Sequence, residues 1–156
     1  GADGKTFNST QAKQLANFVV IYSPIQMAAD LPENYEKYPA AFKFIKDVPT
    51  DWADTRVING EVGKFATIAR KDRASNDWYV GAVTDGEGRT LPLALDFLDK
   101  GKRYTAEIYR DGDSADYRSA RRFDLVTETK TVSAGDTLQL RLAPGGGQAI
   151  RFAPQR

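Results

Sequence analysis

The sequence predicts a mainly β protein, an eight-stranded antiparallel β-sandwich preceded by one or two α-helices. Three observations carry this prediction. From position 56 onward, apolar and polar residues alternate in short runs, which is typical of strands with one buried face. Turn-forming residues separate these runs at intervals of about 8 to 14 residues. Before position 50, apolar residues recur instead at helical spacing.

Composition limits the function classes. The 156 residues are enough for one domain with a real core, and 41% apolar and 28% charged residues are ordinary globular values. The net charge of +1 is spread along the chain, which argues against nucleic acid or an acidic membrane as the main partner. The sequence has no cysteine and no histidine. Disulfides, zinc–thiolate sites and serine–histidine or cysteine–histidine mechanisms are therefore excluded.

Two helices are expected in the first part of the chain. Ser9 or Thr10 can cap the first, which we expect to reach Ala29 with a kink at Pro24. Its apolar face contains Ala12, Leu15, Ala16, Val19 and Tyr22. Because its second half is apolar nearly all round, it needs burial on several faces. The second helix is expected over Pro39–Asp47. Its expected apolar contacts are Phe42, Ile45 and Phe44.

A linker at 48–52 is expected to divide the chain into a helical segment, 1–50, and a sandwich domain, 51–156. The predicted strands are 56–61, 65–70, 78–83, 91–96, 104–109, 123–128, 138–142 and 148–152. The second and third strands form a hairpin. Pro92 cannot donate to a strand ladder, so we expect the fourth strand at an edge or paired on one side only.

Trp52, Trp78 and Tyr79 are the candidate sugar-contact residues. An aromatic face offers a sugar ring an apolar surface with a polar rim. Trp78 and Tyr79 are neighbours on one strand, so they point to opposite faces of the sheet. The alternative, which we favour, is that both tryptophans seal the junction between the helices and the sandwich. Exposure of the three rings on one flat face distinguishes these two hypotheses.

We predict no metal ligand and no catalytic residue in this chain. The loop at 111–116 has three carboxylates, but it lacks the ligand order, central glycine and terminal glutamate of an EF-hand. It is therefore predicted to be a solvated hairpin loop. The triglycine at 145–147 precedes a strand rather than a helix, which favours a turn over a phosphate site. Carboxylates such as Asp77 and Glu87 lack the enclosed site that acid–base catalysis needs.

Several strings of the sequence resemble the C-terminal part of glycoside hydrolase family 97. The longest are VVIYSPIQMAADLPENY at 19–35 and FKFIKDVPTDW at 42–52. Shorter ones lie at 12–16, 60–63, 67–71, 77–81, 104–112 and 143–147. Members of that family are retaining or inverting exo-acting α-glycosidases, chiefly α-glucosidases and α-galactosidases. They consist of an N-terminal β-super-sandwich, a central (β/α)₈ barrel and a C-terminal β-domain.

The resemblance implies that 10–29 is a late barrel helix and that 57–152 is the C-terminal β-domain. The family's catalytic carboxylates and calcium-binding glutamates belong to its other domains, and no position here matches those motifs. The resemblance therefore implies a non-catalytic, cofactor-free chain that caps the barrel of a calcium-using glycosidase. It also implies the barrel of the same polypeptide and α-linked oligosaccharide as partners, in a periplasmic or secreted bacterial enzyme.

Two other functions remain as alternatives. One is a carbohydrate-binding module that uses exposed aromatic rings. The other is a stand-alone enzyme, which the missing histidine and cysteine make the least favoured.

Overall fold

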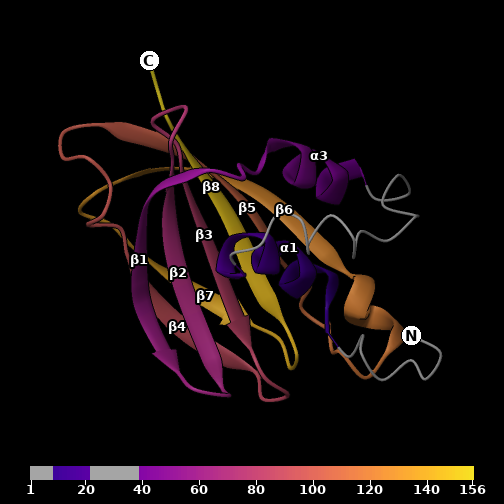
Figure 1. The fold of residues 1–156 in the computed structure, drawn as a ribbon. Coiled ribbons are helices and arrows are strands. Elements are labelled where there is room, and N and C mark those ends of the chain that lie inside the picture. The colour runs from indigo at the N-terminus through magenta and orange to yellow at the C-terminus, as the bar shows by residue number, and fades with distance from the viewer. Residues whose placement is uncertain (1–8, 22–38) are drawn as a thin grey trace.

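The computed structural model describes residues 9–21 and 39–156 (Figure 1). Its helices are α1 (Gln11–Val20), α3 (Pro39–Asp47) and the short 3₁₀ helix η3 (Ala120–Phe123). Its strands are β1 (Trp52–Glu61), β2 (Phe65–Asp72), β3 (Trp78–Thr84), β4 (Arg89–Ala94), β5 (Arg103–Asp111), β6 (Leu125–Ser133), β7 (Thr137–Leu142) and β8 (Gly147–Pro154). The prediction of a mainly β, eight-stranded antiparallel fold is confirmed for the described part of the chain.

The strands form two antiparallel sheets. The larger has six strands in the order β1-β2-β3-β8-β5-β6, so β8 is central although it follows every other described strand in the sequence. The smaller pairs β4 with β7. Because β4 has this one neighbour, the expectation from Pro92 of a strand paired on one side is confirmed.

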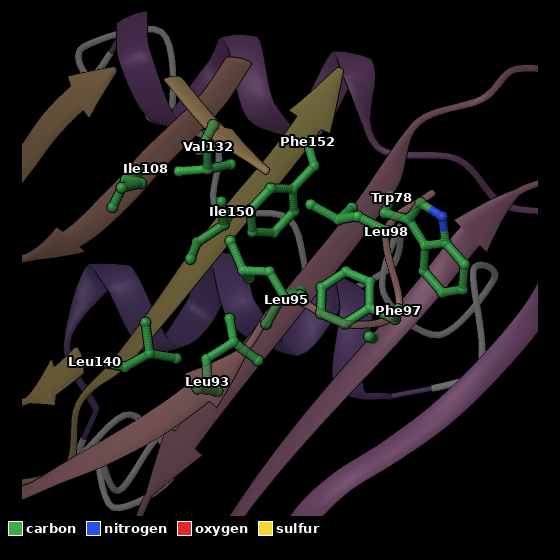
Figure 2. Close-up of a cluster of buried hydrophobic side chains, with 14 of the residues drawn as sticks. Trp78, Leu93, Leu95, Phe97, Leu98, Ile108, Val132, Leu140, Ile150 and Phe152 are labelled. Atoms are coloured by element: carbon green, nitrogen blue, oxygen red, sulfur yellow. The ribbon is translucent and has the colours of Figure 1, made fainter. Parts of the chain in front are cut away.

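The first core lies between the two sheets, as Figure 2 shows. Alternation along β3 sends Trp78, Val80 and Ala82 into this core, while Tyr79 and Gly81 face the other way. Other members of the core are Leu91, Leu93, Leu95, Phe97, Leu98, Ile108, Val132, Leu140, Ile150 and Phe152. Burying each such side chain contributes about 1.5–3 kcal/mol to folding.

The opposite face of the six-stranded sheet carries α1 and α3 (Figure 1). Thr10 is the N-cap of α1, because its hydroxyl accepts a hydrogen bond from the Lys13 amide at 3.2 Å. Four residues of the predicted apolar face of this helix, Ala12, Leu15, Ala16 and Val19, are fully buried, and the fifth, Tyr22, lies outside the described residues. The molecule therefore has three layers: the small sheet, the large sheet and the helices. Within the described ranges, no helix is long and apolar enough to span a membrane.

The first helix is shorter than predicted. It ends at Val20, and Ile21 is already extended, with φ −91° and ψ 122°. The predicted kink at Pro24 and the continuation to Ala29 lie outside the described residues. The string at 19–35 also lies mostly outside the described residues, so its resemblance to family 97 rests on the sequence alone.

Three other expectations need correction. Phe44 is the buried contact of α3, whereas Phe42 is exposed on its outer side. Trp52 does not lie in a linker, because it opens β1 and pairs with Asp72. The strand expected at 123–128 is β6, which begins later because the chain up to Phe123 forms η3. The division into segments 1–50 and 51–156 stays a prediction.

Candidate interface on the helix-bearing face of the sheet

Helix α1 lies unusually close to the sheet, and Gly81 on β3 allows this approach. A Cβ added at Gly81 would lie 2.5 Å from the carbonyl oxygen of Ala16 and 3.0 Å from Val19 Cβ. Any larger residue would therefore push the helix away. The glycine that interrupts the apolar pattern of this strand marks a backbone approach, a typical use of glycine inside strands.

The C-terminal end of α1 is held by Arg70, a buried residue of β2. Its Nε donates to the Val19 carbonyl at 2.6 Å and its Nη2 to the Val20 carbonyl at 3.3 Å. The last carbonyls of a helix have no partner within the helix and carry partial negative charge, so a guanidinium there is favourable. Its Nη1 donates to Thr55 Oγ1 of β1 at 2.8 Å. Arg70 thus supplies donors to the carbonyls of Val19 and Val20, where α1 ends.

The N-terminal end of α1 rests on the turn between β7 and β8. The Thr10 amide donates to the Gly145 carbonyl at 3.0 Å. Under this turn lies Asp111, the last residue of β5, whose Oδ2 accepts from the amides of Ala143 at 2.9 Å and Gly147 at 3.0 Å. Burial raises the pKa of Asp111, and the Thr10 hydroxyl and these two amides partly oppose that rise. Asp111 is thus a buried anchor and not, as predicted, part of a solvated loop.

An aromatic cluster joins α3 to the sheet. Phe44 packs edge-on against Tyr79 and Tyr109, with ring centroids 6.0 and 5.1 Å apart, and Trp52 packs against Tyr79 at 5.6 Å. Such pairs contribute about 0.5–1.5 kcal/mol beyond their buried area. The Tyr79 hydroxyl donates to the Asp47 carbonyl at the end of α3, at 3.0 Å. Burial raises the pKa of Tyr79 well above its ordinary value.

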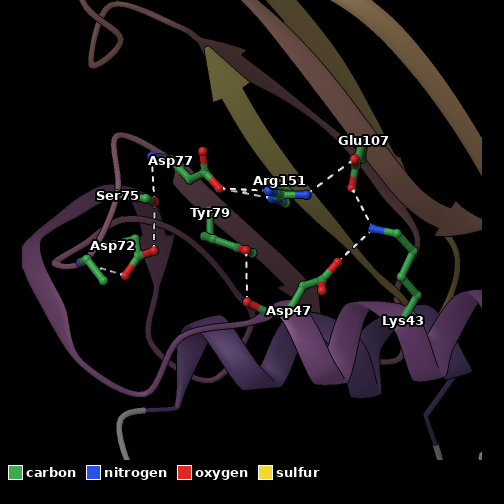
Figure 3. Close-up of polar contacts among 9 residues, drawn as sticks. Lys43, Asp47, Asp72, Ser75, Asp77, Tyr79, Glu107 and Arg151 are labelled. Atoms are coloured by element: carbon green, nitrogen blue, oxygen red, sulfur yellow. Dashed lines mark hydrogen bonds and ion pairs between the residues drawn. The ribbon is translucent and has the colours of Figure 1, made fainter. Parts of the chain in front are cut away.

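A chain of ion pairs runs over the same junction (Figure 3). Arg151 on β8 binds Asp77 Oδ2 at 3.0 Å and Glu107 Oε1 at 3.4 Å. Lys43 on α3 then links Glu107, at 3.4 Å, to Asp47, at 2.6 Å. The hydrogen bond to Asp47 is the main cause that raises the pKa of Lys43. These groups are partly exposed, so each pair adds little stability by itself, but together they fix the position of α3.

The three sugar-contact candidates are all buried. Trp52, Tyr79 and Trp78 are 9%, 2% and 4% exposed. Trp52 and Tyr79 lie in the junction cluster, whereas Trp78 lies in the core between the sheets, 5.1 Å from the ring of Phe97. A stacked sugar needs an accessible ring face, and these rings face protein on both sides of the sheet. Sugar contact through these residues stays a prediction, and in this structure none of the three rings offers an exposed face on which a sugar could stack.

The acidic residues that were considered for metal binding or acid–base catalysis are not grouped into a site either. Among the described residues, no three acidic side chains are grouped to hold a metal ion. In the loop after Asp111, Asp113 pairs with Arg110 and Asp116 pairs with Arg118. Asp77 and Glu87, considered as an acid–base pair, are bound to different arginines, Arg151 and Arg89.

The helix layer carries three large apolar side chains that are exposed. Ile21 follows α1, Phe42 lies on α3 and Phe123 ends η3, and all three are exposed. The three elements lie on the same side of the six-stranded sheet (Figure 1). Exposed large apolar groups of this kind mark interaction surfaces. We call Ile21, Phe42 and Phe123 the outer apolar residues. The nearly all-round apolar character of the first helix was a sequence signal for Ile21, whereas Phe42 was predicted to be a buried contact of the second helix.

Residues 51–153 match the family described as glycosyl-hydrolase 97 C-terminal, oligomerisation. This chain belongs to that family. It is 37% identical over 143 residues to a retaining α-galactosidase of Bacteroides thetaiotaomicron, a match that covers 92% of this chain and 21% of the relative. It is 30% identical over 141 residues to a probable retaining α-galactosidase of Streptomyces bingchenggensis, covering 90% of this chain and 20% of that protein.

Among solved structures, this family 97 C-terminal chain is similar to a family 97 glycoside hydrolase from Pseudoalteromonas sp. strain K8 in complex with acarbose. The sequence identity is 52% and the TM-score is 0.90, over 96% of this chain and 23% of that one. A variant of the same enzyme in complex with panose matches equally well. The chain thus spans about a fifth of the length of these relatives. The resemblance to family 97 is confirmed.

Proposed function

We propose that this chain is the non-catalytic β-domain of a larger family 97 exo-acting α-glycosidase, and that its function is to cap the catalytic barrel. The sheet holds α1 at both ends and along its length, through Arg70, Gly81 and the turn over Asp111. If α1 is a late barrel helix, the sheet fixes the position of the barrel's last element. The remaining faces of the helix layer then receive the barrel.

The outer apolar residues carry this proposal, because they are exposed beside a helix that is itself fully anchored. Apolar groups in that position favour a further packing partner. The chain covers about a fifth of its relatives, which leaves most of the enzyme to supply that partner. The whole enzyme would act on α-linked oligosaccharides, as the acarbose and panose complexes of the similar enzyme suggest.

The calcium of the parent enzyme would be held outside this chain. The described carboxylates do not fit a calcium site, because Asp111 already accepts from two amides and Asp113 and Asp116 are paired with arginines. Calcium prefers six to eight oxygen ligands, and no such group is present among the described residues. No step of hydrolysis is assigned to the residues described.

The double variant Ile21→Ser and Phe42→Ser tests the capping function. In this chain alone, both residues are exposed, so the free energy of unfolding is expected to change by less than about 1 kcal/mol. In the whole enzyme, the same variant is expected to lower the melting temperature and to leave KM for an aryl α-galactoside or α-glucoside unchanged. Equal melting temperatures for the whole enzyme and its variant would contradict capping by this surface.

A second experiment tests the absence of catalysis. The isolated chain is expected to show no turnover of an aryl α-glucoside or α-galactoside. Turnover that disappears when a residue of this chain is replaced would overturn the proposal.

A further inference from the structure

A small pocket lies at the rim of the core between the two sheets, along an open edge of β7. Its volume is about 220 Å³. Strand β7 pairs with β4 alone, so its other edge has no strand partner. Residues 138–141 of β7 all line the pocket, inward- and outward-facing ones alike, which places the unpaired edge along it. The backbone amides and carbonyls of such an edge are available to a ligand.

Gln148 on β8 lines this pocket with a side-chain amide that bonds to no described residue. The residue is only 4% exposed. Along β8 it lies on the same face as Ile150 and Phe152, which belong to the core between the sheets. Buried amides are usually hydrogen-bonded, because burying an unpaired polar group is costly. A molecule in the pocket would supply the missing partners, since the amide can both donate and accept.

Arg110 and Glu128 stand beside Gln148 in fixed positions. Arg110 lies opposite Gln148 on β5, and its Nε donates to Glu128 Oε1 of β6 at 2.9 Å. Its Nη1 donates to the Asp111 carbonyl at 3.1 Å. Within the described ranges, Nη2 of Arg110 and Oε2 of Glu128 have no partner, and Lys130 at the rim forms no ion pair. Donors and acceptors are therefore held ready around the same space.

The charges that line the pocket nearly balance. Arg110, Lys130 and Arg141 are the basic side chains, and Asp113 and Glu128 are the acidic ones. A site that binds an anion or a cation usually carries an excess of the opposite charge. The lining therefore favours an uncharged ligand that can donate and accept several hydrogen bonds.

The rest of the lining is apolar. It comes from Ile108, Leu138 and Leu140, and Figure 2 shows Ile108 and Leu140 at one end of the core, away from Trp78. A pyranose ring combines apolar C–H surfaces with a rim of hydroxyl groups, each of which can donate and accept. Pockets for drug-sized ligands have volumes of roughly 300–1,000 Å³, so this smaller one suits a single ring and not a chain of rings.

We propose that this pocket binds one hexopyranose unit of a carbohydrate. The C–H surface of the ring packs against Leu138 and its apolar neighbours, and the hydroxyl groups bond to Gln148, to the Arg110–Glu128 pair and to the open edge of β7. The site lies on the opposite face of the six-stranded sheet from α1 and α3, so binding is independent of capping. In the whole enzyme the site would retain carbohydrate near the catalytic domain, and this consequence alone rests on the proposed function.

A ¹H–¹⁵N NMR titration of the chain with methyl α-glucoside and methyl α-galactoside tests the site. We expect the side-chain amide signals of Gln148 to shift, with a dissociation constant of about 1–10 mM, typical of a small ligand with few contacts. The side-chain signals of Gln155, whose Nε2 donates to Thr105 and Thr131, are expected to stay in place. Glycerol is the control ligand, because it has hydroxyl groups but no ring surface, and it is expected to shift neither set.

Two variants, followed through the backbone amide of Leu140, give an independent readout. Gln148→Leu removes the amide and keeps a buried side chain of similar size, and it is expected to weaken binding about threefold to tenfold. Gln155→Leu is the matched control outside the pocket and is expected to bind as the wild type does. Lys130→Met changes an exposed residue, so it preserves the fold, and it is expected to weaken binding in the same direction.

Three results would overturn the proposal. The first is the absence of any shift up to about 50 mM of either glycoside, well above the weakest affinity expected. The second is an equal response to glycerol. The third is binding that Gln148→Leu and Lys130→Met both leave unchanged. None of these results bears on capping, which the melting temperature of the whole enzyme tests separately.

Discussion

Replacing Gly81 with alanine tests whether this glycine sets the distance between α1 and the sheet. The added Cβ would lie 2.5 Å from the Ala16 carbonyl oxygen and 3.0 Å from Val19 Cβ and Val20 Cγ2. Non-bonded contacts to carbon need about 3.5 Å, so α1 must move away by about 1 Å at this point. That movement also pulls the Val19 carbonyl from Arg70, 2.6 Å away in the wild type. Overpacking of this kind costs about 1–3 kcal/mol.

Urea unfolding followed by tryptophan fluorescence measures this cost, because Trp52 and Trp78 are both buried in the folded state. A loss of about 1–3 kcal/mol corresponds to a fall of roughly 2–12 °C in melting temperature for a domain of this size. Gly135→Ala is the control, since its added Cβ meets no atom within 4 Å. It is expected to be neutral or to stabilise by up to about 1 kcal/mol. Identical unfolding midpoints for the two variants would refute the close approach of α1 to the sheet.

Three further predictions concern single side chains. Arg70→Met keeps the aliphatic stem but removes the donors to the carbonyls of Val19 and Val20. It is expected to lower the free energy of unfolding in urea by about 2–3 kcal/mol. An unchanged free energy of unfolding would contradict the role of Arg70 at the helix end. Burial raises the pKa of Asp111 above the unfolded value of about 3.9, so the folded state binds this proton more tightly. The stability that Asp111 contributes is therefore greatest below about pH 4 and decreases as the pH rises through the folded-state pKa. The Asp111→Asn variant should lack this decrease. Equal pH dependence of stability in the wild type and in this variant would count against the prediction. A ¹⁵N-amide titration with maltose, maltotriose and melibiose is expected to leave the indole signals of Trp52 and Trp78 unshifted, since both rings are buried.

The strands could be predicted because their signal is local. On β3, the alternation of Trp78, Val80 and Ala82 with Tyr79 and Gly81 predicts two faces, and the structure has a core on one and the helices on the other. The bounds of α3 were predicted for the same reason, since Pro39 begins it and Asp47 ends it. Helical spacing did not reveal which phenylalanine of α3 is buried, because that depends on where the helix meets the sheet.

The interface could not be predicted from local patterns. The side-chain donors to the last carbonyls of α1 come from Arg70, which lies 50 residues after Val20 in the chain. The burial of Asp111 depends on the turn that contains Gly147, 36 residues further along. Both residues are charged, and charged residues are usually exposed, so no local pattern indicated that they are buried. Several of their partners are backbone groups, the carbonyls of Val19 and Val20 and the amides of Ala143 and Gly147, which leave no trace in the sequence.

The central place of β8 has a consequence for biosynthesis. A chain emerges from the ribosome in order, and its early segments begin to fold first. Here β3 and β5 are both complete well before β8, yet each pairs with it directly in the six-stranded sheet. Until Gly147–Pro154 has been synthesised, the sheet stays divided into two parts, and the Gly147 amide that binds Asp111 is missing. A polypeptide truncated before this strand would therefore leave β3 and β5 each with an open edge, and the six-stranded sheet could not form.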